Sequence, residues 1–238
     1  MFLIVPLVLT LFYQIQSSLI IFAPPLLAPN AHIEIGVDAA SVGIITSLIY
    51  LTSVLSAYFA GWLLTRISPK SLSHLCILLS SIGILIMSIP NPYIICLGAL
   101  IIGLGYGPIT PASSAILNEV TPNRIRALIF SIKQSGVPIG GAIAGILVPG
   151  FILISDWKAT IFLISFFGLV LISLSFLINF KVEKNISLEK KINFISPIIY
   201  VLQNKKLREL GFSSFTYSGM QMCLGSYLVL RSEEHTSE

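Results

Sequence analysis

Charge is scarce in this chain of 238 residues. Only 10% of the residues are Asp, Glu, Lys or Arg, whereas soluble domains carry about 25%. Hydrophobic residues make up 55% of the chain, and the mean hydropathy is +0.93. This composition excludes an ordinary water-soluble domain and is typical of a protein that buries its surface against lipid.

Cysteine is also rare, and acidic residues avoid the apolar regions. The three cysteines, Cys76, Cys96 and Cys223, all lie inside apolar stretches, and an odd number without pairs in loops argues against a disulfide framework or a metal site. We expect them to be small apolar fillers. No Asp or Glu lies in the long apolar stretches, so the paired aspartates of an intramembrane protease are absent.

Seven long apolar stretches alternate with short loops. Each has the roughly 20 residues that a helix needs to cross about 30 Å of hydrocarbon. The sequence therefore predicts an all-α membrane protein. A retinal protein also has seven spans, but it needs a Lys in the seventh for its Schiff base, and the seventh stretch has none. The stretches are Phe2–Leu27, Val42–Leu64, Leu72–Ile89, Ile94–Leu117, Ala127–Ile154, Ala159–Phe180 and Leu210–Leu230.

Basic residues occupy every second loop. Arg66 and Lys70 follow the second stretch, Arg124 and Arg126 follow the fourth, and the long segment 181–208 after the sixth is rich in Lys. Because basic loops stay in the cytoplasm, this pattern predicts a cytoplasmic N-terminus. The formal charge of +4 then reports topology and contact with the lipid bilayer, and it does not indicate nucleic-acid binding. We expect a multi-pass, monomeric protein of a bacterial inner membrane.

The last eight residues, 231–238, break the seventh stretch abruptly with charge. Their sequence, RSEEHTSE, resembles the in-frame translation of a short-read sequencing adapter. We therefore expect these residues to lie outside the natural fold and the natural protein to continue beyond Leu230.

The loop after the second stretch carries a recognisable motif. Its sequence from Gly61 to Lys70, GWLLTRISPK, resembles the cytoplasmic signature G-x-x-x-D-R-x-G-R/K of the major facilitator superfamily. Thr65 replaces the acid of that signature and Ser68 replaces its second glycine. The resemblance implies that Gly61 allows close helix approach, while Arg66, beside Lys70, bonds helix C-terminal carbonyls or a neighbouring carboxylate in a gate.

Three further features are similar to the same family. They are an outer turn like W-R-x-x-F at residues 155–162, the basic linker after the sixth span, and a glycine-proline element at residues 135–141. The resemblance implies a six-helix bundle over residues 1–180, built from two inverted three-helix repeats. It further implies a cytoplasmic linker at 181–208 and the first helix of a second bundle at 209–230, within a protein of twelve helices.

Lys133 and Gln134 are polar residues inside the fifth span. Lys133 lies about 10 Å beyond Arg126 along a helix. An intramembrane Lys costs about 2.5–3.5 kcal/mol on insertion scales, so we expect it to face a wet cavity or a partner. The alternative is that its ammonium snorkels to the headgroups. Gln134 is turned about 100° away, so one of the two residues is expected to face the cavity.

Small residues recur four apart in the same span. Gly136, Gly140 and Ala144 form a stripe that favours helix packing, with Gly141 and Gly145 beside it. Pro138 removes a backbone hydrogen bond and is expected to kink the span, which would help two bundles to rock.

The fourth span is rich in glycine and proline from Gly103 to Ser114. Segments interrupted in this way tend to mark transporter binding sites. Tyr106, Thr110 and Ser113 share one face, and either cavity lining or interhelical hydrogen bonding explains them.

Other polar groups lie at mid-depth or near span ends. Because spans one, four and seven line the cavity in the family, the resemblance makes Tyr13, Gln14 and Gln221 candidates for contact with substrate. His32 and His74 are attributed to the membrane interface. Glu34, Asp38 and Asp156 are expected to be solvated charges of outer loops.

These observations predict a secondary active transporter that works by alternating access, without cofactor or metal. A small solute, organic or anionic, is the expected cargo, taken up with a possible coupling proton or ion. Efflux of drugs or metabolites is the alternative. A non-transporting membrane receptor or a nonfunctional fragment is the alternative of another class.

Overall fold

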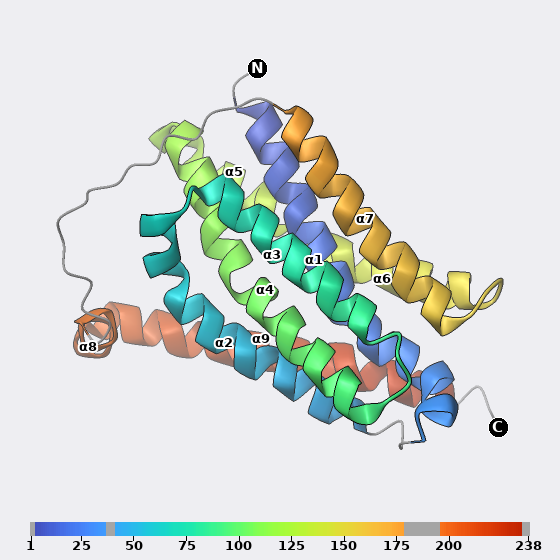
Figure 1. Cartoon of the computed structure of the whole chain (residues 1–238). Helices are drawn as coiled ribbons and strands as arrows, with labels where there is room; N and C mark the ends of the chain where they lie inside the picture. Colours follow the sequence, from blue (N-terminus) through green and yellow to red (C-terminus); the bar gives the residue numbers. More distant parts are fainter. Residues whose placement is uncertain (1–2, 37–40, 179–195, 235–238) are drawn as a thin grey trace. The chain divides into compact units, whose positions relative to one another are not determined.

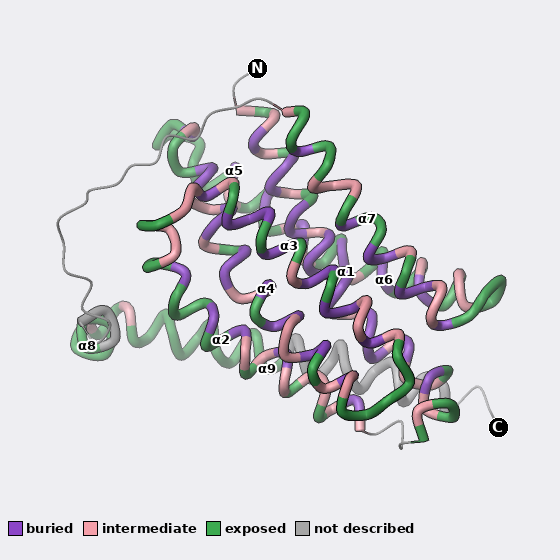
Figure 2. The backbone as a smooth tube through the Cα atoms, in the orientation of Figure 1, coloured by how far each residue is buried: buried purple, intermediate pink, exposed green. Residues whose placement is uncertain are grey.

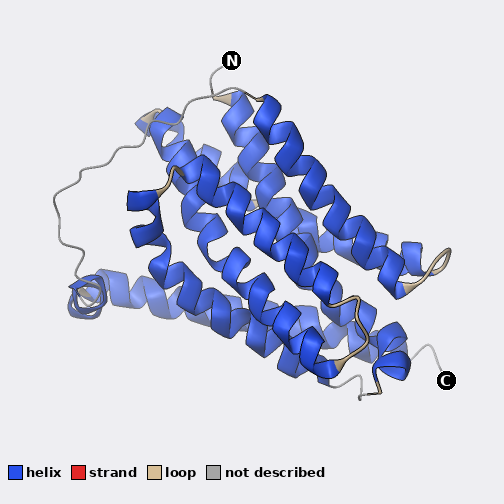
Figure 3. Ribbon diagram, in the orientation of Figure 1, coloured by secondary structure: helices blue, strands red, loops and turns tan. Residues whose placement is uncertain are grey.

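The computed structural model describes residues 3–36, 41–178 and 196–234, the last segment with side chains for residues 199–220. The chain divides into two compact units, residues 1–186 and 187–238. The described residues form helices joined by short loops, with no strand among them (Figure 3).

The first unit contains six helices that are long and apolar enough to cross a membrane. A short 3₁₀ turn, Asn123–Ile125, leads into α5, and α5 with α6 makes up one of the six spans. The all-α prediction is therefore confirmed for the described chain. The elements are α1 (Ile4–Ile35), α2 (Val42–Arg66), α3 (Pro69–Ile86), α4 (Pro92–Val120), α5 (Arg126–Gln134), α6 (Gly136–Ile152) and α7 (Trp157–Leu177).

Local sequence signals set the helix ends. The side chains of Ser68, Asn91 and Asp156 accept hydrogen bonds from backbone N–H groups in the first turns of α3, α4 and α7. Proline follows the first two of these caps, where its missing N–H costs nothing. Gly36 ends α1 with a φ of 75°, which glycine adopts without strain. Helix α1 thus extends past the predicted end at Leu27.

Helix α4 packs between α2 and α3, and glycines make both contacts possible (Figure 1). A Cβ at Gly103 or Gly107 would overlap atoms of α2, and one at Gly98 or Gly105 would overlap atoms of α3. The helix continues through Pro108 and Pro111, so the predicted interruption does not occur. The glycines serve close packing of helices, as small residues do in membranes.

Helix α1 lies at the centre of the unit, against α4, α6 and α7, and is buried over much of its length (Figure 2). The stripe on α6 faces it. A Cβ at Gly136 would lie 2.9 Å from the Cβ of Gln14, one at Gly140 would lie 2.5 Å from the carbonyl oxygen of Ile15, and Ala144 is fully buried. The predicted packing role of the stripe is confirmed.

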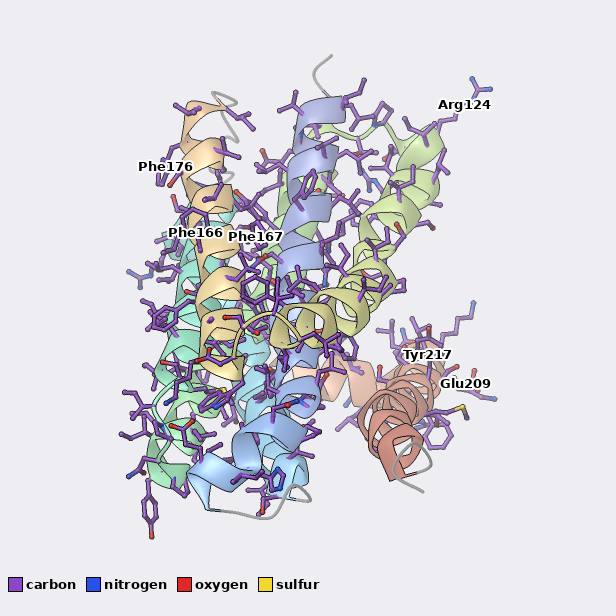
Figure 4. All side chains as sticks on the ribbon, turned by 90° about the vertical axis from the view of Figure 1, so that its right-hand side faces the viewer. Arg124, Phe166, Phe167, Phe176, Glu209 and Tyr217 are labelled. Carbon is purple, nitrogen blue, oxygen red and sulfur yellow. The ribbon has the colours of Figure 1, made fainter. Side chains whose placement is uncertain are left out.

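The outer faces of the helices expose large apolar side chains. Phe166, Phe167 and Phe176 project from α7 (Figure 4), and each is more than 40% exposed. Exposed aromatic side chains on an apolar helix of this length suit contact with lipid.

The second unit contains α8 (Ser196–Gln203) and α9 (Lys205–Glu234). Asn204 begins α9 by accepting hydrogen bonds from the N–H groups of Lys206 and Leu207, and Lys205 pairs with Glu209 one turn later at 3.9 Å. The boundaries expected for the linker (181–208) and the seventh span (209–230) remain predictions, as do those of the terminal segment 231–238.

Candidate functional site

The buried lysine of α5 is the centre of the candidate site. The side chain of Lys133 is 1% exposed. Its Nζ donates to the carbonyl oxygen of Thr110 at 3.3 Å and to Oγ of Ser114 at 3.2 Å, both on α4. The ammonium therefore points into the unit and does not snorkel to the surface.

Helix α1 contributes Gln14 to the same place. Thr110 Oγ1 donates to Oε1 of Gln14 at 3.5 Å, and Gln14 is 1% exposed beside Gly136. Three of the predicted cavity residues, Gln14, Thr110 and Lys133, thus come together from α1, α4 and α5. We call these residues, together with Ser114, the lysine cluster.

The lysine cluster has an unbalanced charge and an open side. An ammonium has three N–H donors, and Lys133 uses two of them on neutral oxygens. Within the described part of the chain, no carboxylate lies at ion-pairing distance from it. The side chain of Thr110 is exposed although it lies in mid-span. A polar group in that position favours a water-filled cavity over lipid.

The remaining cavity candidates lie outside this cluster. The Tyr106 ring stands edge-on to the Tyr50 ring of α2, and the Ser113 hydroxyl bonds the Ile109 carbonyl of its own helix at 2.6 Å. Gln134 is exposed. The side chain of Gln221 lies outside the described residues. Contact with α2 therefore accounts for Tyr106, whereas the Ser113 hydroxyl bonds carbonyls of its own helix.

Tyr13 lies on the other side of α1, in a second polar cluster. Its hydroxyl and Nε2 of His74 each lie 2.7 Å from Oγ of Ser175 on α7. The prediction that His74 is only an interface residue is wrong, since it is 9% exposed and bonded to another helix. Sequence reasoning also missed Ser175, a small polar residue in an apolar helix with no local signal of its role.

The predicted gate residues do not make the contacts that the resemblance implies. No atom lies within 4 Å of a Cβ built at Gly61, so the described residues do not make the close approach expected there. Arg66 lies 5.7 Å from the Trp62 ring and is exposed. Lys70 donates to the Ile178 carbonyl at the end of α7 at 2.8 Å. Lys70 thus makes the helix-end contact expected of Arg66.

The fifth span breaks where the glycine-proline element predicts a kink. Helix α5 ends at Gln134 and α6 begins at Gly136, with Ser135 between them. Pro138 has no N–H to donate to the carbonyl of Gln134, so one backbone hydrogen bond of the helix is missing at this point. The effect of the break on rocking remains a prediction.

A further contact ties α1 to α7 at the far end of the unit. Glu34 accepts a hydrogen bond from Nε1 of Trp157 at 2.9 Å and forms an ion pair with Lys158. The expectations of free charges at Glu34 and Asp156 are therefore wrong, because Asp156 caps α7; Asp38 lies outside the described residues. An apolar cavity of about 50 Å³ lies beside Trp157.

Comparisons with known proteins agree with this architecture. The chain is 30% identical over 115 residues to a gentisate transporter of Corynebacterium glutamicum, covering 48% of this chain and 26% of that protein. It is 31% identical over 147 residues to a homologue of the multi-drug resistance efflux pump PmrA of Lactococcus lactis, covering 58% and 34%. The matched segments span about a quarter to a third of these relatives.

A solved structure has a similar fold. It is a POT family transporter in complex with a thioalcohol conjugated peptide, which superposes with a TM-score of 0.57 at 18% identity, over 96% of this chain and 47% of the other. The family model described as Major Facilitator Superfamily matches residues 7–237. This multi-pass membrane protein therefore belongs to the major facilitator superfamily.

Proposed function

We propose that this chain supplies the first six spans of a secondary transporter that takes up a small organic anion by alternating access. The observation that carries the proposal is the buried ammonium of Lys133, which has neutral partners only among the described residues. The solute would bind between Lys133 and Gln14, at the side where Thr110 is exposed.

Burying the charge of Lys133 in the membrane has a cost that an anion can offset. A lysine at membrane depth costs about 2.5–3.5 kcal/mol on insertion scales, and two neutral oxygens leave its charge in place. A carboxylate would supply both the third hydrogen-bond acceptor and the opposite charge, and hydrogen bonds between ions are the strong ones. Binding an anion therefore recovers part of the burial cost.

The relatives support transport of small solutes. Uptake and efflux are the two directions of transport to compare. The relative named a gentisate transporter suits an anionic solute, because gentisate is a carboxylate. The relative named an efflux pump homologue supports drug efflux as the second candidate. A buried cation that has no carboxylate beside it among the described residues fits anions better than cationic compounds.

Uptake of radiolabelled gentisate into proteoliposomes that hold the full-length protein tests the proposal. Lys133→Gln removes the charge and should lower uptake at least about tenfold, the ratio that corresponds to about 1.4 kcal/mol. Lys133→Arg keeps the charge and should retain part of the uptake. Lys206→Gln, an exposed lysine of α9, is the control and should behave as the parent. Equal uptake by all three variants would reject the anion site.

The gate and the topology belong to the same proposal. We place the N-terminus and the loops at Arg66 and Arg124 in the cytoplasm of a bacterium, and Gly61 and Arg66 against the rest of the transporter. A single cysteine at Asn91 or Ser155 should react with an impermeant maleimide from outside intact cells. Reaction of those positions only after permeabilisation would invert the topology.

A further inference from the structure

Contact with α2 accounts for the ring of Tyr106 and leaves its hydroxyl without a partner. The ring stands edge-on to the Tyr50 ring, with centroids 6.3 Å apart, and the residue is half-buried in the middle of α4. Its hydroxyl makes no hydrogen bond with any described residue and is not sealed from solvent. A phenolic hydroxyl can both donate and accept a hydrogen bond. Tyr106 therefore offers an unused polar group in the middle of an apolar helix.

This hydroxyl belongs to the same face of α4 as the lysine cluster. Tyr106, Thr110 and Ser114 follow one another at intervals of four residues, and residues spaced in this way are neighbours on a helix surface. Helix α4 is continuous through all three positions. Thr110 is exposed between the other two, so the face is open there. Lys133 lies at one end of this row, through its bonds to Thr110 and Ser114, and Tyr106 lies at the other.

We propose that Tyr106 determines which anions this site accepts, by binding a second polar group of the solute while Lys133 binds its carboxylate. The inference rests on the proposed function, which supplies the carboxylate, and it adds the chemistry of the other end of the solute. A neutral hydroxyl matches Tyr106, because a phenol has no charge to balance and exchanges hydrogen bonds in either direction.

The spacing along α4 sets the distance between the two polar groups of the solute. The eight residues from Tyr106 to Ser114 rise about 12 Å along the helix. Both side chains lean toward the start of the helix, so their polar ends keep roughly this separation. Hydrogen bonds of about 2.8 Å at each end leave about 6 Å for the solute itself. A benzene ring with a carboxylate and a hydroxyl on opposite carbons has about this length, whereas neighbouring carbons bring the two groups together.

The ring of Tyr106 also suits a solute that contains an aromatic ring. Aromatic rings prefer edge-on or offset contact, as Tyr106 already makes with Tyr50. Because Tyr106 is only half-buried, part of the residue remains accessible. A rigid ring also loses fewer rotations on binding than a flexible chain of the same length. The site is therefore suited to an aromatic carboxylate with a hydroxyl far from the carboxylate.

Positional isomers test the spacing. 4-Hydroxybenzoate and 2-hydroxybenzoate carry the same groups, but only the first holds its hydroxyl far from the carboxylate. Isothermal titration of the full-length protein in lipid nanodiscs should give a dissociation constant about fivefold lower for 4-hydroxybenzoate, the ratio that one hydrogen bond supplies. Equal dissociation constants for the two isomers in the parent would overturn the proposal.

Tyr106→Phe removes only the hydroxyl and should cancel this preference. 4-Hydroxybenzoate should bind about fivefold more weakly than to the parent, whereas benzoate, which has no hydroxyl, should bind as before. Tyr93→Phe is the matched control and should keep the preference, since Tyr93 lies on the same helix and is 86% exposed. A Tyr106→Phe protein that still prefers 4-hydroxybenzoate by the parental margin would overturn the role of Tyr106.

Lys133→Gln separates this inference from the proposed function. It should weaken benzoate binding at least about tenfold, because the carboxylate loses its cation. A parent that binds no carboxylate, or benzoate that binds the parent and Lys133→Gln equally, would contradict the anion site and the role of Tyr106 with it. Benzoate that depends on Lys133, together with isomers that bind alike, would overturn the role of Tyr106 alone.

Discussion

The buried polar groups on the two sides of α1 have different kinds of partner. Toward α4 and α5, Gln14 accepts a hydrogen bond from the exposed Thr110, whose carbonyl is one of the two neutral partners of the Lys133 ammonium. Toward α3 and α7, the Tyr13 hydroxyl and the His74 imidazole both lie at hydrogen-bond distance from Ser175, inside an apolar cluster. One side holds surplus charge and the other holds a matched chain of hydrogen bonds.

The difference shows how a binding group can be told from an internal one when both are buried. A buried neutral group whose hydrogen bonds are all made can hold helices together. A buried charged group that lacks an oppositely charged partner can still bind a ligand of opposite charge. Lys133 belongs to the second kind. The hydroxyl of Tyr13, bonded to Ser175, belongs to the first kind.

Helix α6 packs against α1 and holds both of its polar sides in place, so the largest effect is expected there. A methyl group at Gly140 would lie 2.5 Å from the Ile15 carbonyl oxygen, whereas one at Gly145 meets no atom within 4 Å. Gly140→Ala should therefore destabilise the protein by about 1–3 kcal/mol, the usual cost of overpacking. Gly145→Ala, with the same gain in helix propensity, should not. Thermal unfolding in detergent measures both, and equal melting temperatures would show that α6 does not constrain α1.

Removing one partner of the ammonium should sharpen the contrast. Ser114→Ala leaves Lys133 with the Thr110 carbonyl alone, so the free energy of unfolding should fall by about 1–3 kcal/mol without solute. Gentisate should then raise the melting temperature more than it does in the parent. Ser113→Ala is the neighbouring control, since that hydroxyl bonds only its own helix. A smaller effect at Ser114 than at Ser113 would contradict the assigned partners.

Two adjacent substitutions on α1 should separate the sides. Gln14→Leu should weaken gentisate binding about fivefold, the equivalent of one hydrogen bond of about 1 kcal/mol. Tyr13→Phe should lower the free energy of unfolding by about 1 kcal/mol and leave the dissociation constant of gentisate unchanged. Isothermal titration and thermal unfolding on both variants give the four values. An equal loss of affinity in the two variants would mean that α1 does not divide the sites.

The contact at the far end of α1 should have the smallest effect. Glu34→Gln removes the charge from an exposed pair with Lys158, and exposed pairs contribute little. We expect gentisate affinity to stay at the parental value and the melting temperature to change less than in any variant above. A large loss of affinity would place Glu34 in the solute pathway.

Hydropathy and residue type were enough to predict the six spans of the first unit, the inward position of Lys133 and the packing stripe on α6. Each depends on local properties: the length of an apolar run, the cost of a charge in lipid, and the spacing of small residues. Helix α1 was predicted too short because the apolar run ends at Leu27, whereas the helix continues through Pro29 until Gly36.

Contacts between distant segments could not be predicted from these signals. His74 and Ser175 lie 101 positions apart in the sequence, and Tyr13 and Ser175 lie 162 apart. Only the folded arrangement of α1, α3 and α7 brings them together. Lys70 makes the helix-end contact expected of Arg66 for a similar reason, because the carbonyl that accepts from Lys70 belongs to Ile178, far away in the sequence at the end of α7.

The binding of gentisate and of its neutral analogue gentisyl alcohol to the full-length protein tests whether Lys133 forms an anion site. If Lys133 binds the carboxylate, Lys133→Gln should raise the dissociation constant of gentisate at least about tenfold and leave that of the alcohol unchanged. The parent should prefer gentisate, and Lys133→Arg should keep part of that preference. If parent and Lys133→Gln bind gentisate equally well, the buried ammonium is structural and the anion site does not exist.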